Sequence, residues 1–165
     1  MSKSFKNRAF TLVEFLVAMS IFVVVTTVVL SLFSAAIKSY RRVSAMQNVQ
    51  ENARFLTEFM TKEIRMSIIK SSTPTTLVLT RSDDQSVSYV FSGNKLERTS
   101  PSSSGPINSE EVLINGRFYV EGIGTGDRQQ PKVTIIMKVE STGGKVEEKA
   151  KIDVQTTLSQ RLIDL

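Results

Sequence analysis

One uninterrupted apolar run dominates the N-terminal quarter of the chain. From Phe10 to Ile37 the sequence reads FTLVEFLVAMSIFVVVTTVVLSLFSAAI, 28 residues with no Pro or Gly and a single charge, Glu14. About 20 apolar residues at ~1.5 Å rise cross a bilayer, so a helix of this length spans one with some tilt. The run is rich in β-branched residues, but strands rarely exceed about 10 residues. The pattern therefore predicts a transmembrane helix.

After Tyr40 the hydrophobic pattern becomes that of an amphipathic helix. Apolar residues recur at steps of three and four on one face: Val43, Met46, Val49, Ala53, Leu56, Met60 and Ile64, widened by Phe55, Phe59 and Ile68. The opposite face is charged, with Glu58 and Lys62 in the favourable i,i+4 order. No Pro occurs before Pro74 and no Gly before Gly93, which predicts one helix from about residue 10 to residue 70, roughly 90 Å long. Its apolar stripe needs a sheet to cover it.

Beyond residue 70 the hydrophobic period falls to two, which is typical of strands. The predicted strands are 76–80, 87–91, 95–98, 112–114, 118–120, 133–139 and 149–158. Turn sequences separate them, at 82–84, 92–94 and 142–144, and a Ser/Pro/Gly-rich connector at 99–109 is predicted to be a flexible loop. The predicted fold class is α+β: a long N-terminal helix packed against a mainly antiparallel β-sheet domain.

The composition excludes much chemistry. The chain has 165 residues and neither Cys nor His, so disulfides, thiolate metal sites and the commonest general base are all missing. We therefore predict no enzyme, no cofactor and no metal site. The net charge is +5, and three of the basic residues, Lys3, Lys6 and Arg8, precede the apolar run. Without them the chain has 18 basic and 16 acidic residues. So balanced a charge does not indicate direct nucleic acid binding.

Two patterns resemble sites without completing them. Ser67-Ile68-Ile69-Lys70 has the S-x-x-K spacing of penicillin-recognising enzymes, but the companion S-D-N and K-T-G motifs are missing. The acidic pairs at 83–84, 110–111 and 147–148 lack the alternating oxygen ligands and the Gly of a calcium loop. Solvated turns are the favoured interpretation of those pairs.

The apolar run has two ordinary interpretations besides the one developed below. A cleaved secretory signal, cut after Ser34-Ala35-Ala36, would have a core about half as long. A plain signal anchor is left open by charge, because the three leader cations are matched by Lys38, Arg41 and Arg42 beyond the run. An anchored extracytoplasmic binding domain and an anchored hydrolase are the functions that would follow from it.

Glu14 is the residue that a plain anchor does not explain. A carboxylate at membrane depth costs roughly 2.5–3.5 kcal/mol on insertion scales. It lies one helical turn after Phe10, so an amine at residue 10 of a neighbouring, axially shifted helix would neutralise it. Such an amine exists only if the chain is cut between Ala9 and Phe10.

Residues 8–16, Arg-Ala-Phe-Thr-Leu-Val-Glu-Phe-Leu, closely resemble the leader junction of type IV prepilins and type II secretion pseudopilins. The resemblance implies that a prepilin peptidase cuts at Ala9–Phe10 and N-methylates Phe10, and that Glu14 acts in subunit assembly. The family usually has Gly where this chain has Ala9. More loosely, residues 52–56 and 63–65 resemble the helix end of minor subunits, the W type in pili and the J type in secretion systems.

The resemblance also implies a domain plan, a location and a set of partners. Residues 1–9 are a cleaved leader, 10–37 the transmembrane and assembly half of the helix, 38–70 its amphipathic half, and 71–165 an extracytoplasmic β-sheet domain. The N-terminus is expected on the cytoplasmic side of the inner membrane. The expected partners are the prepilin peptidase, other pilin or pseudopilin subunits, the inner-membrane assembly platform, and membrane lipid before assembly. The expected function is that of a minor subunit of a type IV pilus-like fibre in pilus biogenesis, type II secretion or DNA uptake.

Overall fold

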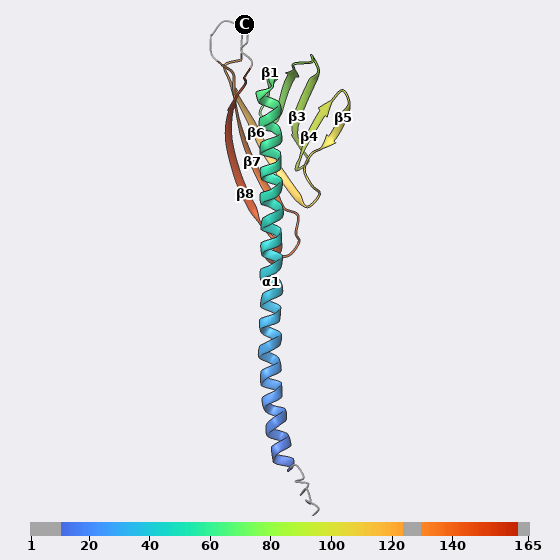
Figure 1. Ribbon diagram of the computed structural model, residues 1–165, viewed down its shortest axis with the longest axis vertical. Coiled ribbons are helices and arrows are strands. Elements are labelled where there is room, and N and C mark those ends of the chain that lie inside the picture. Colours follow the sequence, from blue (N-terminus) through green and yellow to red (C-terminus); the bar gives the residue numbers. More distant parts are fainter. Residues whose placement is uncertain (1–10, 124–129, 162–165) are drawn as a thin grey trace, which may run out of the picture. The chain divides into compact units, whose positions relative to one another are not determined.

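The computed structural model describes residues 11–123 and 130–161 (Figure 1). The chain divides into two compact units, residues 1–40 and 41–165, and one helix, α1 (Leu12–Arg65), contributes to both. Within the described residues the second unit then adds eight strands and one short 3-10 turn. They are β1 (Ser67–Ser72), β2 (Thr76–Arg81), β3 (Ser86–Ser92), β4 (Lys95–Ser100), β5 (Ser103–Pro106), β6 (Val112–Glu121), β7 (Lys132–Ser141), η1 (Val146–Glu148) and β8 (Lys151–Ser159).

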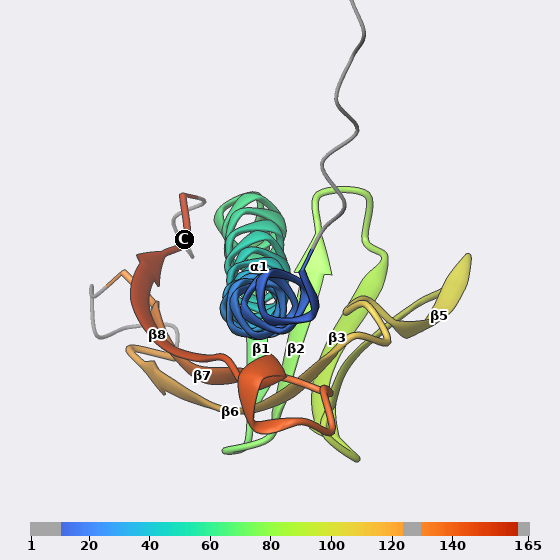
Figure 2. The same ribbon diagram turned by 90° about the horizontal axis from the view of Figure 1, so that it is seen from below.

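The strands form two antiparallel sheets, one in the order β1-β2-β3-β4-β5 and the other in the order β6-β7-β8. Strand β6 of the second sheet is hydrogen-bonded to two turns of the first sheet, the turn between β1 and β2 and the turn between β3 and β4. The backbone N–H of Ile114 donates to the carbonyl of Asn94 at 2.8 Å, and that of Phe118 donates to the carbonyl of Pro74 at 2.9 Å. Seen end-on, the two sheets curve around one flank of the C-terminal part of α1 (Figure 2). The predicted α+β fold, a long helix packed against antiparallel sheets, is confirmed.

The core lies between α1 and the concave faces of the sheets. Five helix residues, spaced three or four apart, are buried there: Val49, Ala53, Leu56, Met60 and Ile64. The sheets contribute the alternate residues of their strands: Ile69, Leu77, Leu79, Val87, Tyr89, Phe91, Leu96, Val112, Ile114, Phe118, Val133, Ile135, Met137 and Val139. Each fully buried aliphatic side chain of this kind stabilises the fold by about 1.5–3 kcal/mol. The predicted stripe is thus confirmed over residues 49–64.

The stripe is narrower than the sequence predicts. Val43 and Met46 are exposed, and Phe55 and Phe59 keep 52% and 37% of their surface in contact with solvent. The two rings instead pack on each other, with centroids 5.8 Å apart. The predicted widening by these aromatic residues is wrong because the sheets cover only the 49–64 row. On the charged face, Glu58 pairs with Arg54, one turn earlier, at 2.7 Å.

The helix also ends earlier than predicted. The sequence predicts helix to about residue 70, but α1 ends at Arg65, and after Met66 the chain enters β1. Ile68 and Ile69 continue the apolar period of the helix, yet β-branched residues also suit a pleated strand, and the open edge of β2 offers a ladder of hydrogen bonds. The amide side chain of Gln160 adds to this, because its oxygen accepts a hydrogen bond from the backbone of Ile69 at 3.1 Å.

Two further predictions about the sheets are corrected. The supposed flexible loop at 99–109 contains the end of β4 and all of β5, joined by a tight turn at 101–102. Hydroxyls support this hairpin, with Thr99 and Ser104 side chains 3.1 Å apart across it. The predicted strands 112–114 and 118–120 form one strand, β6. Gly116 interrupts the apolar pattern there because a Cβ at this position would lie 2.5 Å from the ring of Phe91.

The turn prediction at 92–94 is confirmed. Gly93 and Asn94 adopt φ values of 56° and 61°, the left-handed conformations that a two-residue hairpin turn of this kind requires. Gly and Asn are the residues that adopt them at least cost.

Candidate membrane and assembly segment

The first turn of α1 is closed by a reciprocal cap between Thr11 and Glu14. The Thr11 hydroxyl accepts a hydrogen bond from the backbone N–H of Glu14 at 3.3 Å. In return Oε2 of Glu14 accepts the backbone N–H and the hydroxyl of Thr11, each at 2.9 Å. This is a capping box, in which Thr is the N-cap and Glu the third helical residue. The T-x-x-E spacing before an apolar run signals it in the sequence, and our sequence analysis overlooked it.

Within the described residues, the capping box uses one of the two carboxylate oxygens of Glu14. Both hydrogen bonds from Thr11 reach Oε2, and Oε1 of Glu14 accepts none from the described residues. The predicted cleavage and methylation residues, Ala9 and Phe10, lie outside the described residues. The proximity of Glu14 to an amine at residue 10 therefore remains a prediction.

The hydroxyls within the apolar segment need no outside partner. Ser20, Thr26, Thr27 and Ser31 each donate to a backbone carbonyl three or four residues earlier, at 2.7–2.8 Å. In hydrocarbon an unsatisfied polar group costs several kcal/mol, so this local bonding makes these four residues tolerable there. Glu14 is the single charged residue of the apolar run from Phe10 to Ile37.

The apolar side chains of the first unit cover no core of their own. Those from Leu12 to Phe33 are exposed, among them Phe15, Phe22, Leu30, Leu32 and Phe33, with 59–65% of their surface uncovered. By length and composition α1 is long and apolar enough to cross a membrane. A surface that is apolar all round requires lipid or other apolar helices around it.

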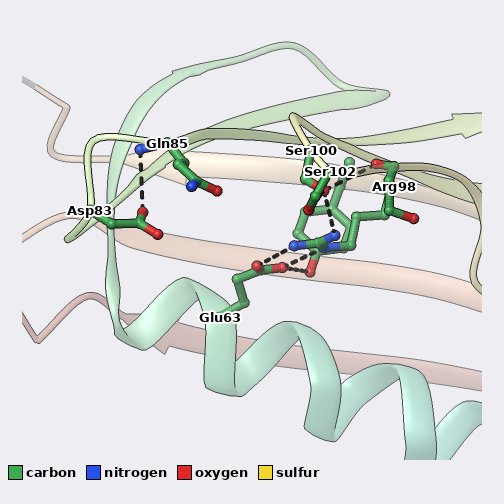
Figure 3. A network of polar contacts seen from close by, with 8 residues as sticks. Glu63, Asp83, Gln85, Arg98, Ser100 and Ser102 are labelled. Atoms are coloured by element: carbon green, nitrogen blue, oxygen red, sulfur yellow. Dashed lines mark hydrogen bonds and ion pairs between the residues drawn. The ribbon is translucent and has the colours of Figure 1, made fainter.

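Polar side chains tie the far end of α1 to the first sheet. Arg98 on β4 binds both carboxylate oxygens of Glu63, through Nη2 at 2.6 Å and Nε at 2.9 Å, and its Nη1 donates to Ser100 Oγ at 3.1 Å (Figure 3). The hydroxyl of Tyr89, on β3, also donates to Glu63. Arg98 further lies over the ring of Phe59, 5.8 Å from its centroid. Our sequence analysis missed this network, because Glu63, Tyr89 and Arg98 are 9 to 35 residues apart and belong to three different elements.

The network fixes the ionisation of its members. Burial raises the pKa of Glu63, but the hydrogen bonds from Arg98 and Tyr89 outweigh it, so the pKa of the carboxyl is lowered overall. Burial first, and then the adjacent Glu63 carboxylate, raise the pKa of Tyr89 far above its ordinary value. The hydrogen bonds to Glu63 likewise raise the pKa of Arg98. At neutral pH the network is therefore a charged pair with a neutral, donating phenol, an arrangement suited to fastening helix to sheet.

The candidate catalytic and metal patterns are not assembled. Ser67 is buried at the start of β1 whereas Lys70 is exposed, because residues three apart in a strand face opposite sides. Among the described residues no group of three or more acidic side chains could hold a metal ion.

Comparison with known families bears on the N-terminal segment. Residues 4–36 match the family described as the prokaryotic N-terminal methylation motif. The chain carries the hallmark of type IV prepilin-like proteins. For such a prepilin-like chain the motif implies processing by a prepilin peptidase and assembly with other pilins, and its family is structural rather than enzymatic. No curated protein and no solved structure matches the chain.

The motif and the helix agree with each other. The matched residues include Thr11 and Glu14 of the capping box and most of the exposed apolar surface of α1. This apolar helix near the N-terminus fits a membrane-anchored, pilin-like protein.

Proposed function

We propose that the chain is a minor pilin or pseudopilin, a structural subunit of a type IV pilus-like fibre that serves pilus biogenesis, protein secretion or DNA uptake. The methylation motif at residues 4–36, set on an apolar segment whose single charge is Glu14, carries the proposal. The cut falls between Ala9 and Phe10, Phe10 becomes the N-methylated first residue, and Glu14 guides assembly. Before assembly the subunit is anchored in the inner membrane, with its β-sheet unit on the extracytoplasmic side.

Processing is the first test. Intact-mass measurement of the protein extracted from membranes of a host with prepilin peptidase should give a chain that begins at Phe10 and carries one added methyl group. Ala9→Gly should be processed at least as well, and Ala9→Val should accumulate precursor, because the position before the cut accepts small side chains. A chain that keeps Met1 to Ala9, or that begins near Ile37, contradicts the proposal.

The role of Glu14 is the second test, and the capping box sharpens it. As the helix leaves lipid for a bundle of apolar helices, little hydrophobic free energy distinguishes the two surroundings. An ion pair at ~4 Å is worth roughly 4 kcal/mol at an effective dielectric constant of 20, before desolvation is subtracted. Such a pair, formed by the Glu14 carboxylate and a neighbour's amine, favours one axial register over slips of a turn.

Three variants separate this role from capping. Gln replaces Glu in capping boxes, so Glu14→Gln keeps the cap and loses the charge. Thr11→Ala keeps the charge and loses the cap, at a cost of about 1 kcal/mol. Glu14→Val loses both. We expect all three to be inserted and cleaved, and we expect fibre incorporation to fall strongly for Glu14→Gln, most for Glu14→Val and little for Thr11→Ala.

The measurement is subunit content in sheared fibres after co-expression with the rest of the assembly system. If Glu14→Gln assembled like the parent while Thr11→Ala failed, the carboxylate would serve only as a helix cap. The signal-anchored extracytoplasmic binding domain would then be the better function.

A further inference from the structure

The loop between β7 and β8 carries an exposed apolar residue at its tip. Val146, the first residue of η1, has 81% of its surface uncovered, the highest value among the large apolar side chains of the described residues. Two exposed lysines flank η1, Lys145 before it and Lys149 after it. A single exposed apolar side chain is common on protein surfaces, so this one gains meaning only from its position.

The loop is held in shape by hydrogen bonds of its own. The backbone N–H of Glu148 donates to the carbonyl of Lys145 at 3.0 Å. The hydroxyl of Ser141, at the end of β7, donates to the carbonyl of Glu148 at 2.5 Å. The turn is therefore a built support, and it holds Val146 away from the core.

An ion pair places this turn close to the end of the apolar run. Nη1 of Arg41 lies 3.3 Å from Oε1 of Glu148, and within the second unit the loop lies at the end where α1 enters (Figure 1). Arg41 follows Ile37, the last residue of the run, by four residues of continuous helix, a rise of about 6 Å. The headgroup layer on each side of a bilayer is about 5–8 Å thick. With the run in hydrocarbon, η1 lies at the level of the headgroups.

The chemistry of the turn suits this depth. An apolar side chain flanked by lysines is typical of segments that lie in the membrane interface, where the apolar group reaches the acyl boundary and the ammonium groups stay with the phosphates. Tyr40, next to Arg41 in the sequence, is 75% exposed, and Tyr is enriched at the same level of a bilayer. The nearby carboxylates of Glu148 and Glu111 are held by Arg41 and Asn48, which reduces their repulsion of phosphates.

We propose that the tip formed by Lys145, Val146 and Lys149 contacts the phospholipid headgroups of the membrane in which α1 is anchored. Val146 enters the boundary between headgroups and acyl chains, and the two ammonium groups bind lipid phosphates. The second unit then has two attachments to one bilayer, the helix and the tip, which restricts its motion at the membrane surface. The proposal rests on the membrane anchorage of α1 and not on cleavage or fibre assembly.

Fluorescence quenching by labelled lipids tests the contact. The chain has no Cys, so Val146→Cys gives a single site for an environment-sensitive fluorophore such as NBD. The labelled full chain is reconstituted in vesicles of phosphatidylcholine and phosphatidylglycerol that carry a nitroxide on the headgroup or near the top of an acyl chain. We expect strong quenching at residue 146 and about tenfold less at Met66→Cys, an exposed apolar site just beyond the other end of α1.

A label at Ser31→Cys, within the apolar run, reports insertion of the helix. Quenching at residue 31 without quenching at residue 146 overturns the proposed contact and leaves the anchor standing. A blue-shifted but unquenched label at residue 146 overturns it as well, because protein rather than lipid would then cover the tip. No quenching at residue 31 overturns the anchorage itself.

Variants separate contact from mere proximity. The label is moved to Gly144→Cys, where an added Cβ meets nothing within 4 Å. Val146→Asp should lower quenching at residue 144 by about fivefold, and Lys145→Gln combined with Lys149→Gln by about twofold. Met66→Asp, at another exposed apolar position, should leave it unchanged. If Val146→Asp and the double lysine variant both left quenching unchanged, the tip would be near the bilayer only through its link to α1, and the proposed contact would be wrong.

Discussion

Two glutamates on α1 show how the same side chain is stabilised in different surroundings. Glu14, in the apolar unit, is held by its own helix N-cap, Thr11. Glu63, half-buried under the first sheet, is held by Arg98 and Tyr89 from two strands. The first arrangement is legible in the sequence as T-x-x-E, because capping is local. The second is not, because only the register of β3 and β4 brings Tyr89 and Arg98 side by side.

The Glu63 network predicts a pH-dependent stability. The folded-state pKa of Glu63 is lowered from its ordinary value of 4.5, so its ionic contribution is present above that value and is lost as the pH falls through the folded pKa. Glu63→Gln should therefore lower the free energy of unfolding by about 2 kcal/mol at pH 7. The deficit should shrink below about pH 4.5, because the unfolded parent binds a proton there whereas the folded parent keeps its charge down to the lowered pKa.

Urea unfolding of the full chain in micelles, followed by the far-ultraviolet signal of the sheets, measures this difference. Arg54→Gln removes an exposed pair with Glu58 and is the control, with no measurable change in the free energy of unfolding expected at any pH. A Glu63→Gln deficit that does not change between pH 7 and pH 4 would contradict an ionic role.

At the level of elements, the hydrophobic period and the turn residues predicted the positions of most strands of the second unit. Strands β2, β3, β4 and β7 lie where alternation placed them, and the Gly93-Asn94 turn joins β3 to β4 as expected. The errors occur where local pattern and tertiary pairing disagree. Ile68 and Ile69 fit the helical stripe, but the free edge of β2 draws them into β1. The Ser-rich sequence of β5 is typical of a linker, but in the fold it forms an antiparallel ladder of hydrogen bonds with β4.

The exposed aromatic residues lead to a second prediction about α1. Leu56 is fully buried, whereas Phe59 lies on the surface beside Arg98. Leu56→Asp should destabilise the second unit by about 4 kcal/mol or more through an unpaired buried charge. Phe59→Asp should cost less than about 1 kcal/mol, since it loses a cation–π contact and some exposed apolar area but gains attraction to Arg98.

The same urea assay ranks the two variants. Limited proteolysis gives an independent measure, because a destabilised sheet unit is cut from its helix sooner. Equal losses for Leu56→Asp and Phe59→Asp would mean that the aromatic pair belongs to the core after all.

On the scale of the whole molecule, two units with different requirements share one helix. The first exposes apolar side chains all round, and the second has a core of its own from α1 and both sheets. Polar contacts also fasten loops of the second unit to α1: Arg41 to Glu148 at 3.3 Å and Asn48 to Glu111 at 2.6 Å. The N-terminal location of the apolar unit and the change of period could be predicted from the sequence.

This division predicts a separable domain. A fragment beginning at Lys38 removes the apolar segment and keeps every buried residue of the core. It should be soluble and monomeric, with mixed helix and strand and a cooperative urea transition. Circular dichroism and analytical ultracentrifugation measure these properties. A disordered or aggregated fragment would show that the second unit depends on the first.

The self-contained hydroxyls of the apolar segment have an energetic consequence for any movement of the helix. Because Ser20, Thr26, Thr27 and Ser31 carry their hydrogen bonds with them, passage from one apolar environment to another breaks none of these bonds. Lipid chains are about as apolar as aliphatic side chains, so the helix has little intrinsic preference between them. Any preference of the segment for one of the two surroundings must therefore come from Glu14, the one charge that it carries.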